Sequence, residues 1–187
     1  MTNDWTTFPD GLPVPEDDGA ADHLPGAQMP DLSLPSTGGT DVNLNQPGTL
    51  VLYLYPRTSK PDEPLLPGWD DIPGARGCTP ESCAFRDSNA DIERLGARVH
   101  GLSAQSLEDQ HEFAERVHLP YAILSDPELE LAAALNLPTF EVAGLMLNKR
   151  LTLIAREGRI AKAFYPIFPP DRHASDVVAW LADSRTV

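Results

Sequence analysis

Apolar and polar positions follow a different pattern in each part of the chain. Polar and apolar residues alternate over residues 31–34 and 41–44 around Ser36-Thr-Gly-Gly39, which predicts a β-hairpin. Residues 49–55 form a nearly continuous apolar run rich in β-forming side chains, and Pro56 ends it. A run of this length without alternation predicts a central strand that is buried on both faces.

A second pattern, in which apolar residues recur every three or four positions, predicts helices in the rest of the chain. The predicted helices span residues 79–95, 106–117, 126–135 and 171–182. The predicted strands between them span residues 98–103, 121–124, 150–155 and 159–165. Because strands and helices alternate and the last two strands form a hairpin, the order predicts an α/β protein. Its mixed central sheet is flanked by helices, with an added N-terminal β-hairpin.

Several residues mark the ends of these helices. Ser106 and Asp109 have the spacing of a capping box at the start of the second helix. Asp126 precedes a proline, as is typical of the residue that caps a helix start. Gly96 and Asn136 directly follow two of the apolar stripes and are predicted to end those helices.

The length of 187 residues favours one domain with a sizeable core. Residues 1–28 are rich in Pro, Gly and Asp and predict an extended arm rather than part of the core. Trp5, Phe8 and Leu24 are the side chains expected to anchor this arm on a domain formed by residues 29–187. A disordered tail is the alternative for the arm.

Residues 57–76 interrupt the pattern of the domain. This segment, called the insertion below, is rich in proline and glycine and is predicted to contain no regular structure. Its larger apolar side chains, which could fold over a neighbouring surface, are Leu65, Leu66, Trp69 and Ile72. A loop of this length in a compact domain is usually functional or disordered, so the insertion is expected to act as a lid or a partner contact.

The charge of the chain excludes some partners. A formal net charge of −14 argues against binding to nucleic acid or to an anionic membrane surface. No apolar run approaches the length of a membrane span. The first residues lack the basic flank and apolar core of a signal peptide, and two cysteines suit a reducing compartment. A cytoplasmic location is therefore expected.

The two cysteines, Cys78 and Cys83, lie five positions apart. Thr79-Pro80 predicts a helix start, with the threonine hydroxyl as the cap and proline as the first helical residue. Cys78 would then lie at the positive end of the helix dipole beside Arg76, and both features favour its nucleophilic thiolate. Within an intact helix the two Cα atoms would be roughly 8–9 Å apart, so a disulfide requires the first turn to unwind.

The two cysteines allow two other interpretations. Each could be a small apolar side chain packed in the core. A metal site is disfavoured because the chain has no second cysteine pair and its histidines lack the spacing of metal ligands. These scattered histidines are His23, His100, His111, His118 and His173. His111 and His118 are expected at the surface.

Two segments resemble a known family. Tyr53-Leu-Tyr-Pro56, followed by Gly77-Cys-Thr-Pro-Glu-Ser-Cys-Ala-Phe-Arg-Asp87, resembles the active-site segment of peroxiredoxins. The cysteine spacing is similar to that of the peroxiredoxin Q (bacterioferritin comigratory protein) branch. Lys149-Arg-Leu-Thr-Leu-Ile-Ala-Arg-Glu-Gly158 is similar to the hairpin that carries the family's active-site arginine, although its spacing to the glycine is more like the type V branch. The resemblance runs from about residue 29 onward and implies a thioredoxin-like fold.

The resemblance also implies a function, that of a thiol peroxidase for hydrogen peroxide or alkyl hydroperoxides. Cys78 would be the peroxidatic cysteine and become a sulfenic acid, and Cys83 would resolve it as an intramolecular disulfide. Arg150 would stabilise the thiolate and orient the peroxide, with Lys149 and Arg156 as alternative cations. Thioredoxin or a similar dithiol would reduce the disulfide. No cofactor or metal is implied, and a monomer and a homodimer both remain open.

One part of the family pattern is missing. In the family the cysteine follows Pro-x-x-x-Thr-x-x-Cys, and the threonine hydroxyl helps to hold the peroxide. The corresponding positions here are Asp71 and Ala75. If the insertion bulges outward and returns, Thr58 or Ser59 is predicted to supply the missing hydroxyl.

Two other functional classes were considered. A thiol–disulfide oxidoreductase is disfavoured because the chain has no Cys-x-x-Cys motif. A redox-sensing domain could instead use Cys78 and Cys83 as a switch without catalysis. Repeated turnover of peroxide with a dithiol donor distinguishes the peroxidase from such a sensor.

Overall fold

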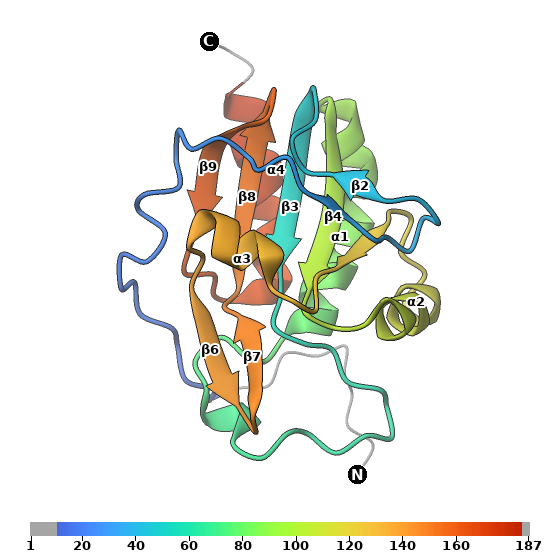
Figure 1. Cartoon of the computed structure of the whole chain (residues 1–187), viewed down its shortest axis with the longest axis vertical. Helices are drawn as coiled ribbons and strands as arrows, with labels where there is room; N and C mark the ends of the chain where they lie inside the picture. The colour runs from blue at the N-terminus through green and yellow to red at the C-terminus, as the bar shows by residue number, and fades with distance from the viewer. Residues whose placement is uncertain (1–10, 185–187) are drawn as a thin grey trace.

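A mixed five-stranded sheet in the order β5-β4-β3-β8-β9 forms the centre of the computed structural model, which describes residues 11–184 (Figure 1). Its strands are β3 (Thr49–Leu54), β4 (Ala97–Ser103), β5 (Ile123–Ser125), β8 (Leu151–Arg156) and β9 (Arg159–Phe164). β3, β4 and β5 run parallel to one another, whereas β8 is antiparallel to both β3 and β9. The predicted mixed sheet is therefore confirmed.

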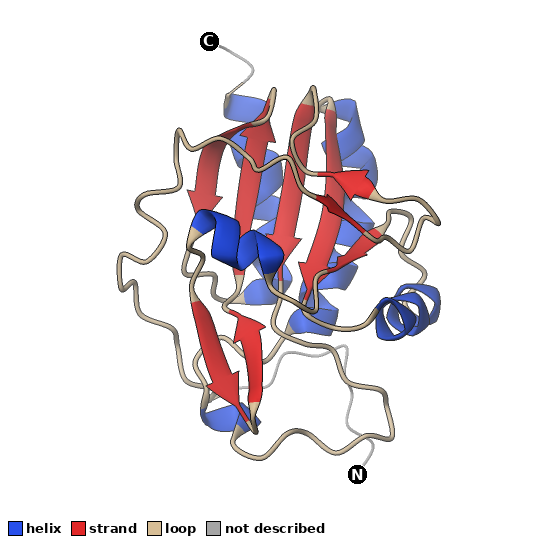
Figure 2. Ribbon diagram, in the orientation of Figure 1, coloured by secondary structure: helices blue, strands red, loops and turns tan. Residues whose placement is uncertain are grey.

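Helices cover both faces of this sheet (Figure 2). The α-helices of residues 11–184 are α1 (Cys78–Arg94), α2 (Leu107–Arg116), α3 (Glu130–Leu135) and α4 (His173–Asp183). α1 and α4 lie side by side on one face, and α2 lies beside β5 at the edge. α3 and the hairpin of β1 (Ser33–Leu34) and β2 (Val42–Asn43) cover the opposite face, so the predicted N-terminal hairpin is confirmed.

β3 divides the core into two layers. Leu50, Leu52 and Leu54 point into the cluster under α3 and the β1–β2 hairpin. Val51 and Tyr53 point into the cluster under α1 and α4. Since side chains of a strand alternate between faces, burial on both faces requires the continuous apolar run seen in the sequence.

Several of the predicted end signals are found in the structure, although α3 begins at Glu130 and not at residue 126. The Ser106 hydroxyl accepts a hydrogen bond from the Asp109 N–H at 3.2 Å, as expected of a capping box. The Asp126 carboxylate accepts the first free N–H groups of α3. Gly96, two residues after α1, and Asn136, directly after α3, both adopt positive φ angles, 80° and 49°. Within residues 11–184, none of the helices combines the length and apolar character that a bilayer span requires.

The hairpin of β6 (Thr139–Val142) and β7 (Leu145–Asn148) is not predicted by the sequence pattern. Its turn residues, Ala143 and Gly144, have φ angles of 50° and 79°. Alanine is rare at positive φ, so the sequence carries no familiar turn motif here. The strands also lack the usual alternation of buried apolar and exposed polar residues, because Leu145 and Met146 are apolar yet exposed.

The insertion packs beneath the β6–β7 hairpin (Figure 1). Trp69 is only 5% exposed and lies against Phe140, with ring centroids 6.3 Å apart. The other predicted apolar side chains of the segment pack around the same cluster; they are Leu65, Leu66 and Ile72. One correction is needed, because Trp69–Asp71 form a 3-10 helix where no regular structure was predicted.

Residues 11–28 run beside β9 without forming a helix or a strand (Figure 1). Leu24 is fully buried, and the Gly26 N–H donates to the Ile160 carbonyl at 2.7 Å. Trp5 and Phe8, the other expected anchors, lie outside the described residues. The division into an arm and a domain stays a prediction.

Candidate active site

Cys78 is the first residue of α1 and is only 4% exposed. Gly77 precedes it with a φ of 98°, a left-handed conformation that turns the chain into the helix and favours glycine. The predicted cap is wrong, because Thr79 lies inside the first turn and no side chain caps this helix. The thiol therefore lies at the positive end of the α1 dipole, as predicted.

Arg150 is the cation at this thiol. Its Nη2 donates to Cys78 Sγ at 3.2 Å, and its side chain is almost completely buried. The alternative cations turn elsewhere: Lys149 forms an ion pair with Asp18 at 2.8 Å, and Arg156 donates to Ser184. Arg150 directly precedes β8, which pairs with β3, so the sheet brings the arginine under the start of α1.

The end of the insertion surrounds the Arg150 guanidinium with carbonyl oxygens. Nε donates to the Gly74 carbonyl at 3.3 Å, and Nη2 donates to the carbonyls of Ala75 and Arg76 at 3.4 and 3.0 Å. These contacts fix the guanidinium plane against Cys78. The insertion thus contributes to the site through its main chain.

Glu81 is a site residue that the sequence analysis did not single out. Its carboxylate is fully buried, and Oε2 forms an ion pair with Arg150 Nη1. Burial raises the pKa of Glu81 to about 7, although the adjacent guanidinium lowers it. Its position three residues after Cys78, one turn along the same helix, is the signal that could have identified it.

The pKa of the Cys78 thiol depends on burial and on tertiary contacts. On balance the pKa of the Cys78 thiol is raised: burial raises it most, whereas the Arg150 guanidinium and a hydrogen bond from the Arg57 backbone N–H lower it by less. Arg76, the predicted neighbouring cation, pairs with Asp70 at 2.6 Å. Arg150 therefore supplies the positive charge that contacts the sulfur.

Cys83 is half-buried on the same helix, and both cysteines are free thiols. α1 is continuous from its first residue, so the helix geometry holds the two thiols beyond disulfide range. Ser82, between them, accepts hydrogen bonds from the hydroxyls of Tyr53 and Tyr121 at 3.1 and 3.0 Å. These bonds attach the start of α1 to β3 and to the segment before β5.

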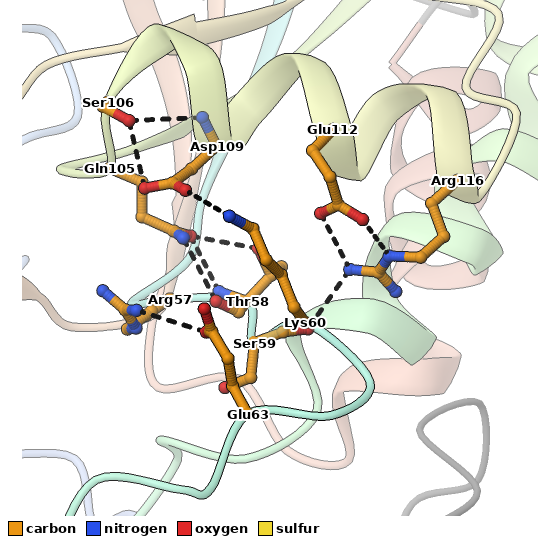
Figure 3. Close-up of polar contacts among 10 residues, drawn as sticks. All are labelled: Arg57, Thr58, Ser59, Lys60, Glu63, Gln105, Ser106, Asp109, Glu112 and Arg116. Atoms are coloured by element: carbon orange, nitrogen blue, oxygen red, sulfur yellow. Dashed lines mark hydrogen bonds and ion pairs between the residues drawn. The ribbon is translucent and has the colours of Figure 1, made fainter.

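Thr58 and Ser59 lie at the start of the insertion, where it meets α2 (Figure 3). The Thr58 hydroxyl is buried and donates to Gln105 Oε1 at 3.1 Å. The Ser59 carbonyl accepts a hydrogen bond from Arg116 Nη2 at 3.1 Å. Contact of either hydroxyl with a peroxide stays a prediction.

Three of the five histidines, His23, His100 and His173, lie within hydrogen-bond distance of a polar group of the fold. His173 Nε2 lies 2.9 Å from Thr152 Oγ1, and His111 and His118 are exposed as predicted. Among residues 11–184, no group of three or more His, Cys, Asp or Glu side chains is arranged to hold a metal ion.

This fold and site define a thiol-based redox protein of thioredoxin-like architecture. The family model described as Redoxin matches residues 24–181. The chain therefore belongs to the Redoxin family and, within it, to the peroxiredoxins, which are thiol peroxidases. The predicted family and thioredoxin-like fold are both confirmed.

Individual relatives agree with this assignment. The chain is 30% identical over 164 residues to peroxiredoxin Bcp of Bacillus subtilis (strain 168), a match that covers 84% of this chain and 94% of that protein. It is 26% identical over 158 residues to the chloroplastic peroxiredoxin Q of Gentiana triflora, covering 83% of this chain and 65% of that protein.

Solved structures give the same result. The crystal structure of peroxidoxin BcpB from Mycobacterium tuberculosis is similar with a TM-score of 0.69 at 27% identity, covering 86% of this chain and 98% of that chain. A structure of Xanthomonas campestris peroxiredoxin Q has a TM-score of 0.67 at 26% identity, and the match covers 86% of this chain and 95% of that chain.

Proposed function

We propose that this chain reduces hydroperoxides with Cys78 as the peroxidatic thiol, Cys83 as the resolving thiol and Arg150 as the residue that stabilises the reacting thiolate. One observation carries the proposal: Arg150 Nη2 lies 3.2 Å from the Cys78 sulfur at the start of α1. Burial disfavours the Cys78 thiolate, so a fixed positive charge in contact with sulfur is needed to offset it.

The proposed chemistry proceeds in two steps. The Cys78 thiolate attacks the terminal peroxide oxygen, the O–O bond breaks, and the leaving oxygen takes a proton to depart as water or an alcohol. Cys78 is then a sulfenic acid. The Cys83 sulfur attacks the Cys78 sulfur and expels water, forming the disulfide. Because an intact α1 keeps the two sulfurs apart, the first turn of the helix must open in the second step.

Peroxide binding is proposed to use three kinds of group. Arg150 and the N–H groups at the start of α1 face the developing negative charge. The Thr58 hydroxyl, whose proton is donated to Gln105, still has a lone pair to accept a hydrogen bond from the peroxide. Ser59 is the alternative hydroxyl.

Both hydrogen peroxide and alkyl hydroperoxides are proposed substrates. A cavity of about 300 Å³ adjoins Arg150, and much of its lining is apolar, including Ile72, Phe140 and Ile167. Structures of the Xanthomonas campestris bacterioferritin comigratory protein, which is 25% identical to this chain, concern alkyl peroxide reduction by that protein. An apolar space beside the arginine supports the same class of substrate here.

Thioredoxin or a similar dithiol protein is the proposed reductant, in a cytoplasmic setting. The test is consumption of NADPH by thioredoxin reductase, thioredoxin and this protein with hydrogen peroxide, tert-butyl hydroperoxide or cumene hydroperoxide. Continuous turnover with at least one peroxide is expected. If the protein consumes only one equivalent of peroxide with thioredoxin and with glutaredoxin as donors, it is a redox switch and the proposal is wrong.

A further inference from the structure

Gln105 holds Thr58 through three hydrogen bonds (Figure 3). Its Oε1 accepts from the Thr58 N–H at 2.8 Å and from the Thr58 hydroxyl at 3.1 Å. Its Nε2 donates to the Thr58 carbonyl at 3.1 Å. Both side chains are buried, at 6% and 5% exposure, so these polar groups depend on one another for partners.

Gln105 is itself held by buried groups. Its N–H donates to Ser103 Oγ at 3.2 Å, and its carbonyl accepts from Ser125 Oγ at 2.7 Å. Ser103 Oγ also accepts from Gln110 Nε2 at 2.8 Å. Reversing the Gln105 amide would place its NH₂ against the Thr58 N–H, so the contacts fix its orientation. Gln105 is therefore a rigid clamp on Thr58.

The clamp lies next to the residue that touches the reacting thiol. Arg57 directly precedes Thr58, and a hydrogen bond from its backbone N–H is one of the influences that lower the pKa of Cys78. On the other side of Arg57, Pro56 is buried at the end of β3. Arg57 is thus held between a buried proline and a clamped threonine, which determines the direction of its N–H.

The clamp also lies between Arg57 and the middle of the insertion. From Lys60 to Gly68 the chain forms no helix or strand. Loops without regular structure open locally at low free energy. Fixing Thr58 prevents such motion from reaching the Arg57 N–H.

We propose that Gln105 is a positioning residue of the peroxidase: by clamping Thr58 it aims the Arg57 backbone N–H at Cys78. This rests on the proposed function, in which Cys78 is the reacting thiol. A main-chain donor at the site also gives the chain a hydrogen bond at Cys78 although Ala75 stands where the family pattern has threonine.

The test is Gln105→Met, which keeps the shape of the side chain and removes every hydrogen bond of its amide. The variant is combined with Cys83→Ser, so that Cys78 is the only thiol, and the rate of alkylation by iodoacetamide is measured against pH. The midpoint is expected to move to higher pH than in Cys83→Ser alone, because a hydrogen bond to the thiolate is lost. The rate constant for reaction with hydrogen peroxide is expected to fall about tenfold.

Arg116→Gln is the matched control, because Arg116 holds the carbonyl of Ser59, one residue further along the insertion. It is expected to leave both the midpoint and the peroxide rate unchanged. Circular dichroism is used to check that Gln105→Met is folded. If it is not, Gln105→Asn, whose side chain is one methylene shorter and withdraws the amide from Thr58, is measured in its place. An unchanged midpoint in a folded Gln105 variant overturns the proposal, as does an equal shift in Arg116→Gln. Alkylation needs no peroxide turnover, so the result does not depend on the peroxidase proposal being correct.

Discussion

Arg150 Nη2 lies 3.2 Å from Cys78 Sγ, although 72 residues separate the two in the chain. The guanidinium also touches the carbonyls of Gly74, Ala75 and Arg76 and the carboxylate of Glu81. These contacts therefore fix both the position and the orientation of the Arg150 guanidinium. The buried Cys78 thiol therefore faces a positive charge of fixed position and direction.

Replacing Arg150 should impair the reaction strongly. Arg150→Met is expected to lower the rate constant with hydrogen peroxide by about 10² to 10³, since a preorganised charged donor to the reacting atoms is lost. Stopped-flow tryptophan fluorescence measures this rate. Lys149→Met is the control, because this neighbouring cation pairs with Asp18 at the surface, and an exposed pair contributes little. Equal losses in the two variants would show that general positive charge, not the Arg150 contact, matters.

The Thr58 hydroxyl should affect the reaction with peroxide separately from the clamp. Thr58→Val removes the hydroxyl but keeps the backbone bonds to Gln105, so the pH dependence of Cys78 alkylation is expected to remain unchanged. The peroxide rate should fall about tenfold through loss of one hydrogen bond in a buried site. Ser59→Ala is the matched variant. If the rate constant with hydrogen peroxide falls by no more than about twofold in both Thr58→Val and Ser59→Ala, neither hydroxyl holds the peroxide.

Oxidation should open the first turn of α1. Backbone amides of residues 79–84 are expected to exchange hydrogen faster in the disulfide form, because the bridge cannot form on the intact helix. The same residues in oxidised Cys83→Ser serve as the control and should stay protected. Unchanged exchange in protein shown by mass to contain the Cys78–Cys83 bond would contradict the opening of the helix.

His173 should make the protein less stable in acid. Burial, together with the charge of Arg150, lowers the pKa of His173 from 6.5 to about 3. The native state therefore binds fewer protons than the unfolded state in this range. The contribution of neutral His173 to the free energy of unfolding is fully present above pH 6.5. It is lost as the pH falls toward 3, by up to about 1.4 kcal/mol per pH unit.

Urea unfolding of the reduced protein at a series of pH values measures this effect. His173→Gln should remove that part of the pH slope, whatever it does to stability at neutral pH. His111→Gln, which changes an exposed histidine, should keep the slope of the parent. Parallel curves for the parent and His173→Gln would show that His173 does not titrate as expected.

Local signals were sufficient to predict much of the fold. The continuous apolar run of β3 and the capping box at Ser106 depend only on neighbouring residues, and the structure contains both. The β6–β7 hairpin was missed because its turn uses Ala143 at positive φ and its exposed side chains are apolar. Elements whose residues prefer the conformation they adopt, such as β3, were predicted. The β6–β7 hairpin, whose turn alanine adopts a disfavoured conformation, was not.

The site was less predictable, because its contacts join distant segments. Proximity in sequence suggested Arg76 as the cation beside Cys78, but that side chain pairs with Asp70. Family resemblance, and not periodicity, pointed to Arg150. The contribution of Glu81 and the Gln105 clamp on Thr58 depend on tertiary contacts that no local pattern encodes.

The central claim is the division of roles between the two cysteines, and a single-turnover measurement tests it most directly. Reduced parent, Cys78→Ser and Cys83→Ser are each mixed with one equivalent of hydrogen peroxide, trapped with dimedone and analysed by intact mass. The account predicts an intramolecular disulfide in the parent, a dimedone adduct on Cys78 in Cys83→Ser, and unmodified protein in Cys78→Ser. An adduct on Cys83 in Cys78→Ser, formed as fast as the parent reacts, would contradict it.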